Sequence, residues 1–455
     1  MDTQTLTIYK ALEQMRSGSL QAAELGAACQ QRIELLNPHI NAFITILKPD
    51  SQSNPSMGAL AGIPIALKDL YETAGVRTTC GSLFFKDYIP ANDSVVAERL
   101  KAAGAQICGK TNTHEIALGV TGINPHFGAV HNPWNLAHMT GGSSSGSAAA
   151  VAVGMCLAAM GTDTGGSIRI PASLCGVVGL KPTYGRISTR GIFPLSWNLD
   201  HAGPLTRSVR DAAILLQVLA GYDELDPYSV KMPVDDYLTG LNSGVKNLRL
   251  AVLTGTYAWE ADPEVLEAVR IGTLVFESLG AEVEPVEMNF LLDAARANSV
   301  MTPADAAVFH QERLKNFPLD FGADIRERLT IGASYSSTDY ILARRTQTEM
   351  RRRMEIFFQK FDALILPATP ISAPLIEGSD ALSQARSLTR FTAPFNLTGL
   401  PAISLPCGFS EAGLPIGMQI VCRAWDEMKL LQIAQAFENA TGWHLRHPDL
   451  SSLLN

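Results

Sequence analysis

Three short segments of the 455-residue sequence combine serine, lysine and glycine in a pattern that could support acyl transfer. GIPIALKDL contains Lys68, TGGSSSGSAAA contains the serines at 143–145, and GTDTGGSIRIPAS contains Ser167. A serine hydroxyl is a weak nucleophile until a base takes its proton, and a lysine made neutral by burial can be that base. Lys68 follows the apolar run 63–67, which would carry its side chain inside. The segments therefore indicate a serine nucleophile assisted by lysine, without deciding which serine attacks.

The residues just ahead of Ser167 could stabilise the charge that forms during such a reaction. The sequence Asp-Thr-Gly-Gly at 163–166 would expose several backbone N–H groups, which is the donor nest that an oxyanion requires. A helix starting near Ile168 would add its positive end at the same place.

Two other motifs point to different chemistry. GAQICGKT at 104–111 matches the phosphate-loop pattern and would make Lys110 a nucleotide ligand. GSSSG at 142–146 fits a nucleophile elbow with Ser144 at its centre, served by a histidine such as His310, His444 or His447. Their context is unfavourable, because Gly104 is expected to end a helix and residues 132–140, ahead of Ser144, are expected to form a loop.

The elements around these segments predict an α/β fold with a large mixed, twisted β-sheet covered by helices on both faces. We expect one domain, 1–455, with a helical N-terminal arm at 1–58, a catalytic core at 59–215, and the remaining sheet and pocket helices at 216–455. The arm is a helical pair closed by Pro38, and Asp93 is expected to cap a helix that ends at Gly104. Further expected elements are strands at 106–108, 248–253, 281–286, 402–405 and 415–421, and helical runs at 148–160, 263–279 and 426–439.

Composition excludes several classes of protein. The chain carries 36 Lys and Arg against 44 Asp and Glu, a net charge of −8, which disfavours nucleic acid as a ligand. Its seven scattered cysteines predict neither a disulfide framework nor a metal site, and a reducing compartment fits them best. No signal peptide or membrane span is expected, so the predicted protein is cytoplasmic. We also expect a monomer or homodimer.

The ordered blocks of the sequence resemble those of the amidase signature enzymes. These blocks are GIPIALKD, GKTNTHE, FGAVHNPW, GGSSSGSAAAVA, GTDTGGSIRIPA, CGVVGLKPTYGRIS, LDHAGPLTRSVRDAA, ALILPATP and GLPIGMQIV. The separations of 75 residues from Lys68 to Ser143 and of 24 from Ser143 to Ser167 are also typical of this family.

The resemblance implies a catalytic triad and its setting. Ser167 matches the nucleophile, Ser143 the bridging serine in a cis peptide, and Lys68 the buried lysine. The implied oxyanion donors are the N–H groups of Thr164, Gly165, Gly166 and Ser167. The implied supporting residues are Gly142, Ser144, Thr162, Asp163 and Arg169. The resemblance also implies that the protein uses no cofactor.

One departure from the family bears on the substrate. Glutamine-hydrolysing members, which belong to tRNA-dependent amidotransferases, place an acidic residue about seven before the position of Asn396, where this chain has Thr389 beside Arg390. The favoured function is therefore a stand-alone amidohydrolase for a small apolar or aromatic amide, carbamate or ester. The alternative is the glutamine-hydrolysing component of an aspartyl- or glutamyl-tRNA amidotransferase. Pocket residues are expected at 118–124, 196–199, 303–333 and 387–395, without individual assignments.

Overall fold

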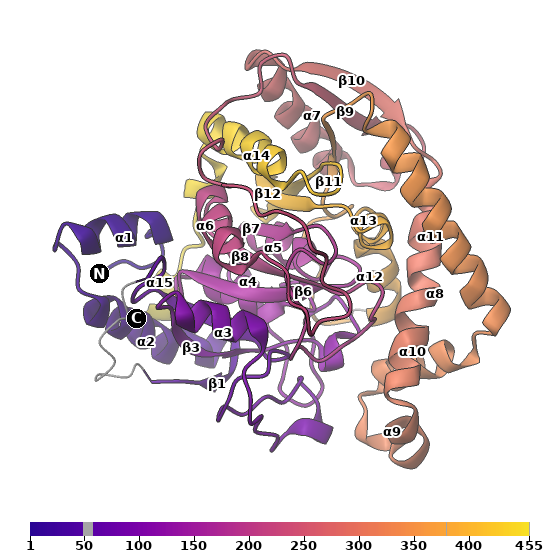
Figure 1. Cartoon of the computed structure of the whole chain (residues 1–455). Coiled ribbons are helices and arrows are strands. Elements are labelled where there is room, and N and C mark those ends of the chain that lie inside the picture. The colour runs from indigo at the N-terminus through magenta and orange to yellow at the C-terminus, as the bar shows by residue number, and fades with distance from the viewer. Residues whose placement is uncertain (49–57, 379, 455) are drawn as a thin grey trace.

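The computed structural model describes residues 1–48, 58–378 and 380–454, and an 11-stranded mixed sheet forms its centre (Figure 1). The strand order is β1-β3-β2-β6-β8-β7-β12-β13-β11-β9-β10, and β4 and β5 form a separate pair. The strands are β1 (Phe43–Ile46), β2 (Pro64–Lys68), β3 (Gln106–Thr111), β4 (His131–Asn132), β5 (Asn135–Met139), β6 (Ala158–Asp163), β7 (Val178–Lys181), β8 (His201–Thr206), β9 (Arg249–Thr254), β10 (Glu282–Glu287), β11 (Ala363–Pro367), β12 (Ala402–Phe409) and β13 (Pro415–Val421). Strand β2 runs parallel to both β3 and β6, whereas β8 is antiparallel to its neighbours β6 and β7.

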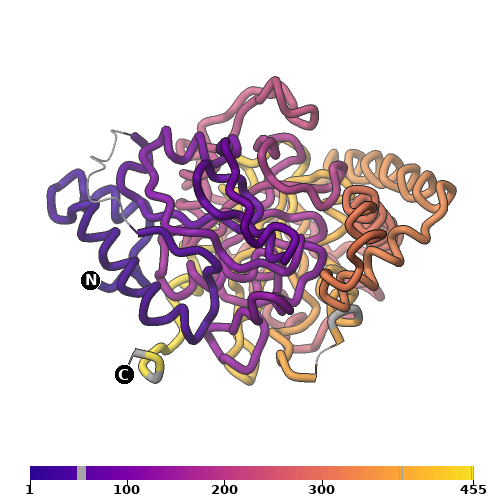
Figure 2. The backbone as a smooth tube through the Cα atoms, turned by 90° about the horizontal axis from the view of Figure 1, so that it is seen from below, coloured from indigo at the N-terminus to yellow at the C-terminus, as the bar shows by residue number. Residues whose placement is uncertain are grey.

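The helices supply both covers of the sheet and an additional layer at one end. They are α1 (Ile8–Arg16), α2 (Ala22–Ile40), α3 (Val95–Ala102), α4 (Ser145–Ala152), α5 (Arg169–Cys175), α6 (Val209–Leu219), α7 (Pro263–Ser278), α8 (Leu291–Phe309), α9 (Gln311–Asn316), α10 (Ala323–Ser334), α11 (Ser337–Phe357), α12 (Ala381–Leu388), α13 (Ala393–Thr398), α14 (Glu427–Thr441) and α15 (Ser451–Leu454). In Figures 1 and 2, α1 and α2 lie with both termini at one end of the molecule, and α8, α10 and α11 lie at the opposite end.

The central strands are apolar on both faces, as expected for strands that helices cover from two sides. In β2, the side chains of Ile65 and Leu67 join one hydrophobic cluster and that of Ala66 joins another. The first cluster packs under α3, α6, α7 and α14, and the second packs under α2, α4 and α5. This alternation confirms the predicted α/β fold with helices on both faces.

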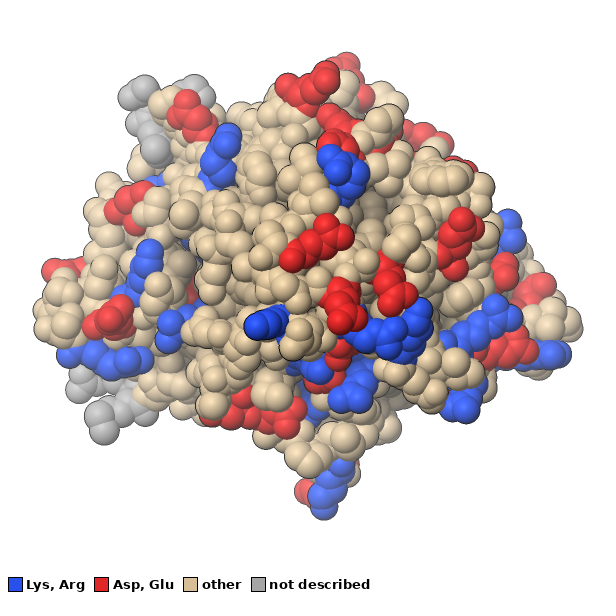
Figure 3. Space-filling view, turned by 90° about the horizontal axis from the view of Figure 1, so that it is seen from above, with Lys and Arg blue, Asp and Glu red and all other residues tan. Residues whose placement is uncertain are grey.

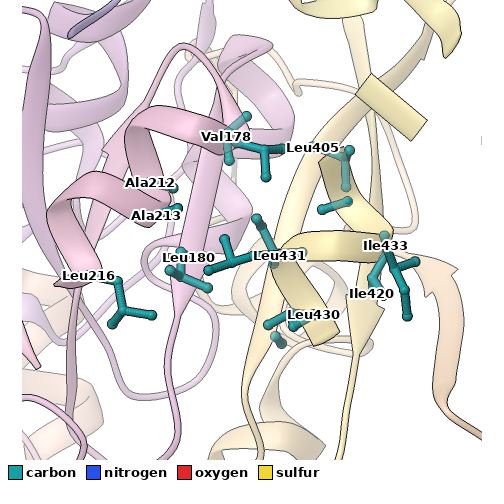
Figure 4. Packing of buried hydrophobic residues seen from close by; sticks show 14 of the residues in the cluster. Val178, Leu180, Ala212, Ala213, Leu216, Leu405, Ile420, Leu430, Leu431 and Ile433 are labelled. Carbon is teal, nitrogen blue, oxygen red and sulfur yellow. The ribbon is translucent and has the colours of Figure 1, made fainter. Parts of the chain in front are cut away.

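One part of the larger cluster lies where α6 and α14 pack against the sheet. Figure 4 shows side chains from β7, β12, β13 and these two helices meeting there. Leu431 of α14 is completely buried in this cluster, as are Leu180 and Leu216. The sheet and its helical cover are therefore joined mainly by aliphatic packing at this point.

The surface has a mixed charge on the face drawn in Figure 3, where basic and acidic side chains are interspersed across a largely uncharged surface. Within the described residues, no helix is both long and apolar enough to cross a membrane.

Several sequence predictions require correction in detail. The helix predicted at 148–160 ends at Ala152 and is followed by strand β6, because Gly154, with a φ of +72°, turns the chain. Ser94, not Asp93, caps α3, since the Ser94 hydroxyl accepts the N–H of Ala97. Residues 132–140 contain β4 and β5 rather than only loop.

The N-terminal arm also differs from its prediction. Helix α2 continues past Pro38 to Ile40, and the chain then forms β1, which pairs with β3 at the edge of the sheet. Residues 49–57 of the predicted arm lie outside the described residues. Because strands from both the first and last thirds of the chain share one sheet, we retain the single domain at 1–455 as a proposal.

We expect Leu431→Ala to lower the free energy of unfolding by about 2–5 kcal/mol, because the truncation leaves a cavity in a close-packed core. The exposed Leu342 of α11, 53% exposed, provides the control, and Leu342→Ala is expected to change stability by less than about 0.5 kcal/mol. Urea unfolding followed by circular dichroism measures both variants. Equal losses would contradict the placement of Leu431 in the core.

Candidate active site

Lys68 lies at the end of β2, and its side chain is fully buried. Its Nζ donates hydrogen bonds to Ser143 Oγ and to Thr162 Oγ1, both at 2.7 Å. Among the described residues, no carboxylate lies within ion-pair distance of Nζ. Burial lowers the pKa of Lys68 from 10.5 to about 7, against the opposing influence of Asp200 and Asp163.

Ser143 and Ser144 have different environments although they are neighbours. The peptide bond between Gly142 and Ser143 is cis, as the resemblance implied, and the Ser143 carbonyl accepts the Thr113 hydroxyl at 2.8 Å. The Ser144 hydroxyl instead donates to the Thr162 carbonyl and accepts the Thr162 N–H, each at 3.2 Å. Ser143 therefore faces the lysine, and Ser144 anchors this turn to β6.

Ser167 lies in the turn between β6 and α5, and it lines a cavity. The N–H of Ser144 donates to the Ser167 carbonyl at 3.1 Å, which brings the two serine segments together. Within the described part of the chain, the Ser167 hydroxyl makes no hydrogen bond, so this structure does not show a hydrogen bond from Ser167 to Ser143. Catalytic hydrogen bonds often form only when substrate is bound.

The segment before Ser167 carries unused backbone donors. In the described structure, the N–H groups of Gly165, Gly166 and Ser167 donate to no protein acceptor, which suits a developing oxyanion. Gly166 has a φ of +136°, and a side chain there would collide with Thr392. Glycine at this position is therefore required both by the backbone conformation and by the neighbouring threonine.

Asp163 and Arg169 form a buried ion pair that fixes the two ends of this segment. Arg169 contacts both carboxylate oxygens, with Nη2 at 2.9 Å from Oδ1 and Nε at 3.0 Å from Oδ2. Burial would raise the pKa of Asp163, but the Arg169 guanidinium outweighs it and holds that pKa well below its usual range. Asn396 donates to Asp163 Oδ1 and accepts from Arg169 Nη2, so both charges have additional partners.

Sequence reasoning missed three residues that hold the segment from outside. Asn298 of α8 donates to the Thr164 carbonyl at 3.0 Å, and Thr392 donates to the Gly165 carbonyl at 2.6 Å. Asp200 accepts the Thr164 hydroxyl at 2.6 Å. Asn298 and Thr392 are separated from the segment by more than 100 residues and belong to no local motif, so only the Asp200 position, within LDHAGPL, had any signal in the sequence.

The cavity in front of Ser167 has a volume of about 540 Å³. The predicted pocket ranges 118–124, 303–333 and 387–395 each contribute to its lining, whereas 196–199 does not and only the adjacent Leu195 does. Residues of α8 between Leu292 and Thr302 also line it and were not predicted. Thr389, at the position where the resemblance implies an acidic residue in glutamine-hydrolysing members, and its neighbour Arg390 both line the cavity.

The two competing motifs do not form functional sites. Residues 104–111 include strand β3, and Lys110 is buried with its Nζ donating to the Tyr71 carbonyl and the Thr78 hydroxyl. A lysine held in this way is not available for a phosphate, so the nucleotide-binding interpretation is wrong.

The histidines considered as partners for Ser144 lie elsewhere. The His310 ring packs edge-on against Phe309 and Phe321. His444 and His447 line a separate cavity together with N-terminal residues. The nucleophile-elbow interpretation therefore lacks a base. No group of three or more potential metal ligands occurs among the described residues.

Comparison with known proteins identifies the family to which this sequence and its site belong. The family model described as Amidase matches residues 24–431. The chain is 38% identical to the A component of the glutamyl-tRNA(Gln) amidotransferase of Roseiflexus sp. (strain RS-1), over 98% of each protein. This chain belongs to the amidase family. The predicted amidase signature resemblance is thereby confirmed.

Solved structures of other proteins share the fold of this amidase-family chain. One, from an inhibitor-bound vestigial protein complex described as revealing the evolutionary origins of an s-triazine catabolic enzyme, has a TM-score of 0.91 and 32% identity, covering 96% of this chain and 99% of the other. Another, a 6-aminohexanoate cyclic dimer hydrolase complexed with substrate, has a TM-score of 0.87 and 32% identity over the full length of both. The fold is thus shared by enzymes named for different substrates.

We expect Arg169→Met to lower the free energy of unfolding by about 3–5 kcal/mol, because it leaves the Asp163 carboxylate buried without its counter-charge. Adding Asp163→Asn to this variant is expected to restore part of the loss. Arg345→Met, which breaks the exposed pair with Glu349, is the control and should cost less than about 1 kcal/mol. Denaturant unfolding measures these three variants and Asp163→Asn alone, and a double variant as unstable as the sum of the two single variants, Arg169→Met and Asp163→Asn, would contradict the coupling.

Proposed function

We propose that the chain hydrolyses the C–N bond of an amide through an acyl-enzyme intermediate, with Ser167 as nucleophile, Ser143 as proton relay and Lys68 as base. The observation that carries the proposal is the contact between the buried amine of Lys68 and Ser143 Oγ, next to a loop with unused N–H donors that opens on a cavity. A base, a relay, a nucleophile and oxyanion donors are the groups that acyl transfer requires.

The reaction would proceed in two halves. Ser167 Oγ attacks the amide carbonyl while its proton passes to Ser143, whose own proton passes to neutral Lys68. The oxyanion rests on the N–H groups of Thr164, Gly165, Gly166 and Ser167. The Lys68 ammonium then returns its proton through Ser143 to the leaving nitrogen, and the C–N bond breaks. Water, activated by the same relay, attacks the acyl-serine and releases the acid.

The supporting residues keep this arrangement in place. Thr162 accepts a hydrogen bond from Lys68 Nζ and fixes the direction of the amine. Ser144 and Gly142 shape the turn that presents Ser143, and the pair of Asp163 and Arg169 holds the Ser167 loop. In the proposed reaction, the side chains of Thr162, Ser144, Asp163 and Arg169 exchange no proton with the substrate or the triad.

A second candidate function is the glutamine-hydrolysing component of an amidotransferase. The relatives named as glutamyl-tRNA(Gln) amidotransferase components, similar over nearly the full chain, favour it over a stand-alone amidohydrolase. In this function, the ammonia released from glutamine is used by a partner protein, so hydrolysis of glutamine should increase when that partner is present. Hydrolysis of an ester or a carbamate would use the same nucleophile, relay and base as amide hydrolysis.

We expect Ser167→Ala to lower kcat/KM for acyl p-nitroanilides by at least about a thousandfold, because the nucleophile is lost. Lys68→Ala should produce a loss of similar size. The control is Ser278→Ala, at an exposed hydroxyl on α7. Release of p-nitroaniline measures the rates, and equal rates for wild type and Ser167→Ala would reject the assignment.

We expect activity to rise with pH through about 7. The pKa of Lys68 is lowered to about 7, so the amine is protonated and inactive below this pH and neutral above it. Burial raises the pKa of Asp200 to about 6, so its carboxylate is charged at pH 7 and favours the ammonium form of Lys68.

Asp200→Asn should therefore shift the rise in kcat/KM toward lower pH, whereas Asp236→Asn, at an exposed carboxylate, should leave it in place. The pH dependence of anilide hydrolysis measures both. A flat profile from pH 5 to 9 would argue against Lys68 as the base.

A further inference from the structure

The cavity in front of Ser167 carries charge of one sign. Four arginines line it, namely Arg296 of α8, Arg328 of α10, Arg386 of α12 and Arg390 just after α12. Among the described residues that line the cavity, none is Asp or Glu. A concave wall with charge of one sign concentrates ligands of the opposite sign.

The protein provides few carboxylates for these guanidinium groups. Arg296 approaches Asp293 at 3.6 Å on the exposed face of α8, and Arg328 lies near Asp324 of its own helix. In the described structure, Arg386 and Arg390 make no ion pair with a carboxylate. Arg390 instead lies over the ring of Tyr257, with its guanidinium carbon 4.5 Å from the ring centroid. Arg328 also lies near Glu327 and Asp380, so the positive charge that no carboxylate of the described residues pairs with is that of Arg386 and Arg390.

Apolar side chains also line the cavity. Leu118, Val120 and Leu195 line it on the side of the catalytic core. A volume of about 540 Å³ is within the range for small-molecule sites. A suitable ligand is therefore small, with a short hydrocarbon part and an anionic end. The planar guanidinium fork matches a carboxylate through two parallel hydrogen bonds.

We propose that the substrate is the monoamide of a short dicarboxylic acid, with the amide at Ser167 and the free carboxylate among the four arginines. This inference rests on the proposed amide hydrolysis and specifies its substrate class. Water replaces the amide nitrogen, and the products are ammonia and the dicarboxylate. Glutamine also carries a carboxylate, but its ammonium group would approach guanidinium groups with no acidic side chain to receive it. Glutamine is therefore a poorer substrate than glutaramate, which is glutamine without the amino group.

The test compares matched amides on the full-length enzyme. Malonamate, succinamate and glutaramate are each compared with the corresponding diamide, in which a neutral carboxamide replaces the carboxylate, and glutaramate is compared with glutamine. Ammonia release gives kcat/KM. For at least one chain length, kcat/KM for the monoamide acid is expected to exceed kcat/KM for its diamide by about tenfold or more. A difference of this size is the effect of one charge-assisted contact. This preference should decrease as salt is raised.

Variants at exposed arginines connect the preference to the cavity without disturbing the core. Arg386→Gln and Arg296→Gln should each raise KM for the acid more than KM for the diamide, so that the ratio of acid to diamide kcat/KM falls by about threefold or more. Arg386→Lys should recover part of the ratio because it keeps the charge. Arg352→Gln, on the exposed part of α11 and outside the cavity, is the control and should have no effect.

The outcomes separate this inference from the proposed function. Equal rates for acids and diamides at every length, or hydrolysis of anilides but of none of the three acids, overturns the substrate class and leaves amide hydrolysis standing. Glutamine hydrolysed as well as glutaramate also overturns it and favours the amidotransferase function. An enzyme inactive on all of these amides and on anilides would reject the proposed function and the inference together.

Discussion

The site depends on the burial of one lysine without a carboxylate in contact. Lys110 and Lys181 are also fully buried, but Lys110 faces Asp69 at 3.8 Å, and Lys181 donates to the carbonyls of Pro182 and Leu400. Lys68 has only the hydroxyls of Ser143 and Thr162 as partners among the described residues. A hydroxyl group can accept a hydrogen bond from an ammonium group or donate one to a neutral amine, whereas a carboxylate would stabilise the ammonium form. Burial lowers the pKa of Lys110 to about 8 against the influence of Asp69, and it lowers the pKa of Lys68, which has no carboxylate in contact among the described residues, to about 7.

The surrounding fold keeps the Lys68 amine away from water and holds the neighbouring Ser167 loop in a fixed conformation. Strands β2 and β6 lie side by side as the third and fourth strands from the β1 edge of the sheet, and they supply Lys68 and Thr162 from positions covered on both faces. The loop after β6 is then held by contacts from three directions, through Arg169, Asn298 and Thr392. Each contact satisfies a carboxylate or carbonyl of the loop and leaves its N–H groups to the substrate.

The sequence was sufficient for those features that are determined by neighbouring residues. The apolar run before Lys68 predicted that its side chain is buried, and Gly-rich segments located the two serine turns. It was insufficient where distant residues decide the result. Asn298 and Thr392 reach the Ser167 loop only after the sheet has formed, so no local pattern could identify them.

The substrate cavity illustrates the same limit and has a further consequence. Its reactive wall comes from the turn between β6 and α5 and from loop residues such as Leu195, whereas its arginines come from α8, α10, α12 and the residues just after α12. Helices α8 and α10 lie at the end of the molecule, in the layer added to the two covers of the sheet (Figure 1). Of the four arginines, Arg296 of α8 and Arg386 of α12 are exposed and contact nothing in the Lys68 relay. Substitutions on the helical wall can therefore change which amide is bound while the relay stays intact. Such a division of the site between a fixed sheet and a separate helical layer explains how enzymes of one fold can be named for unrelated substrates.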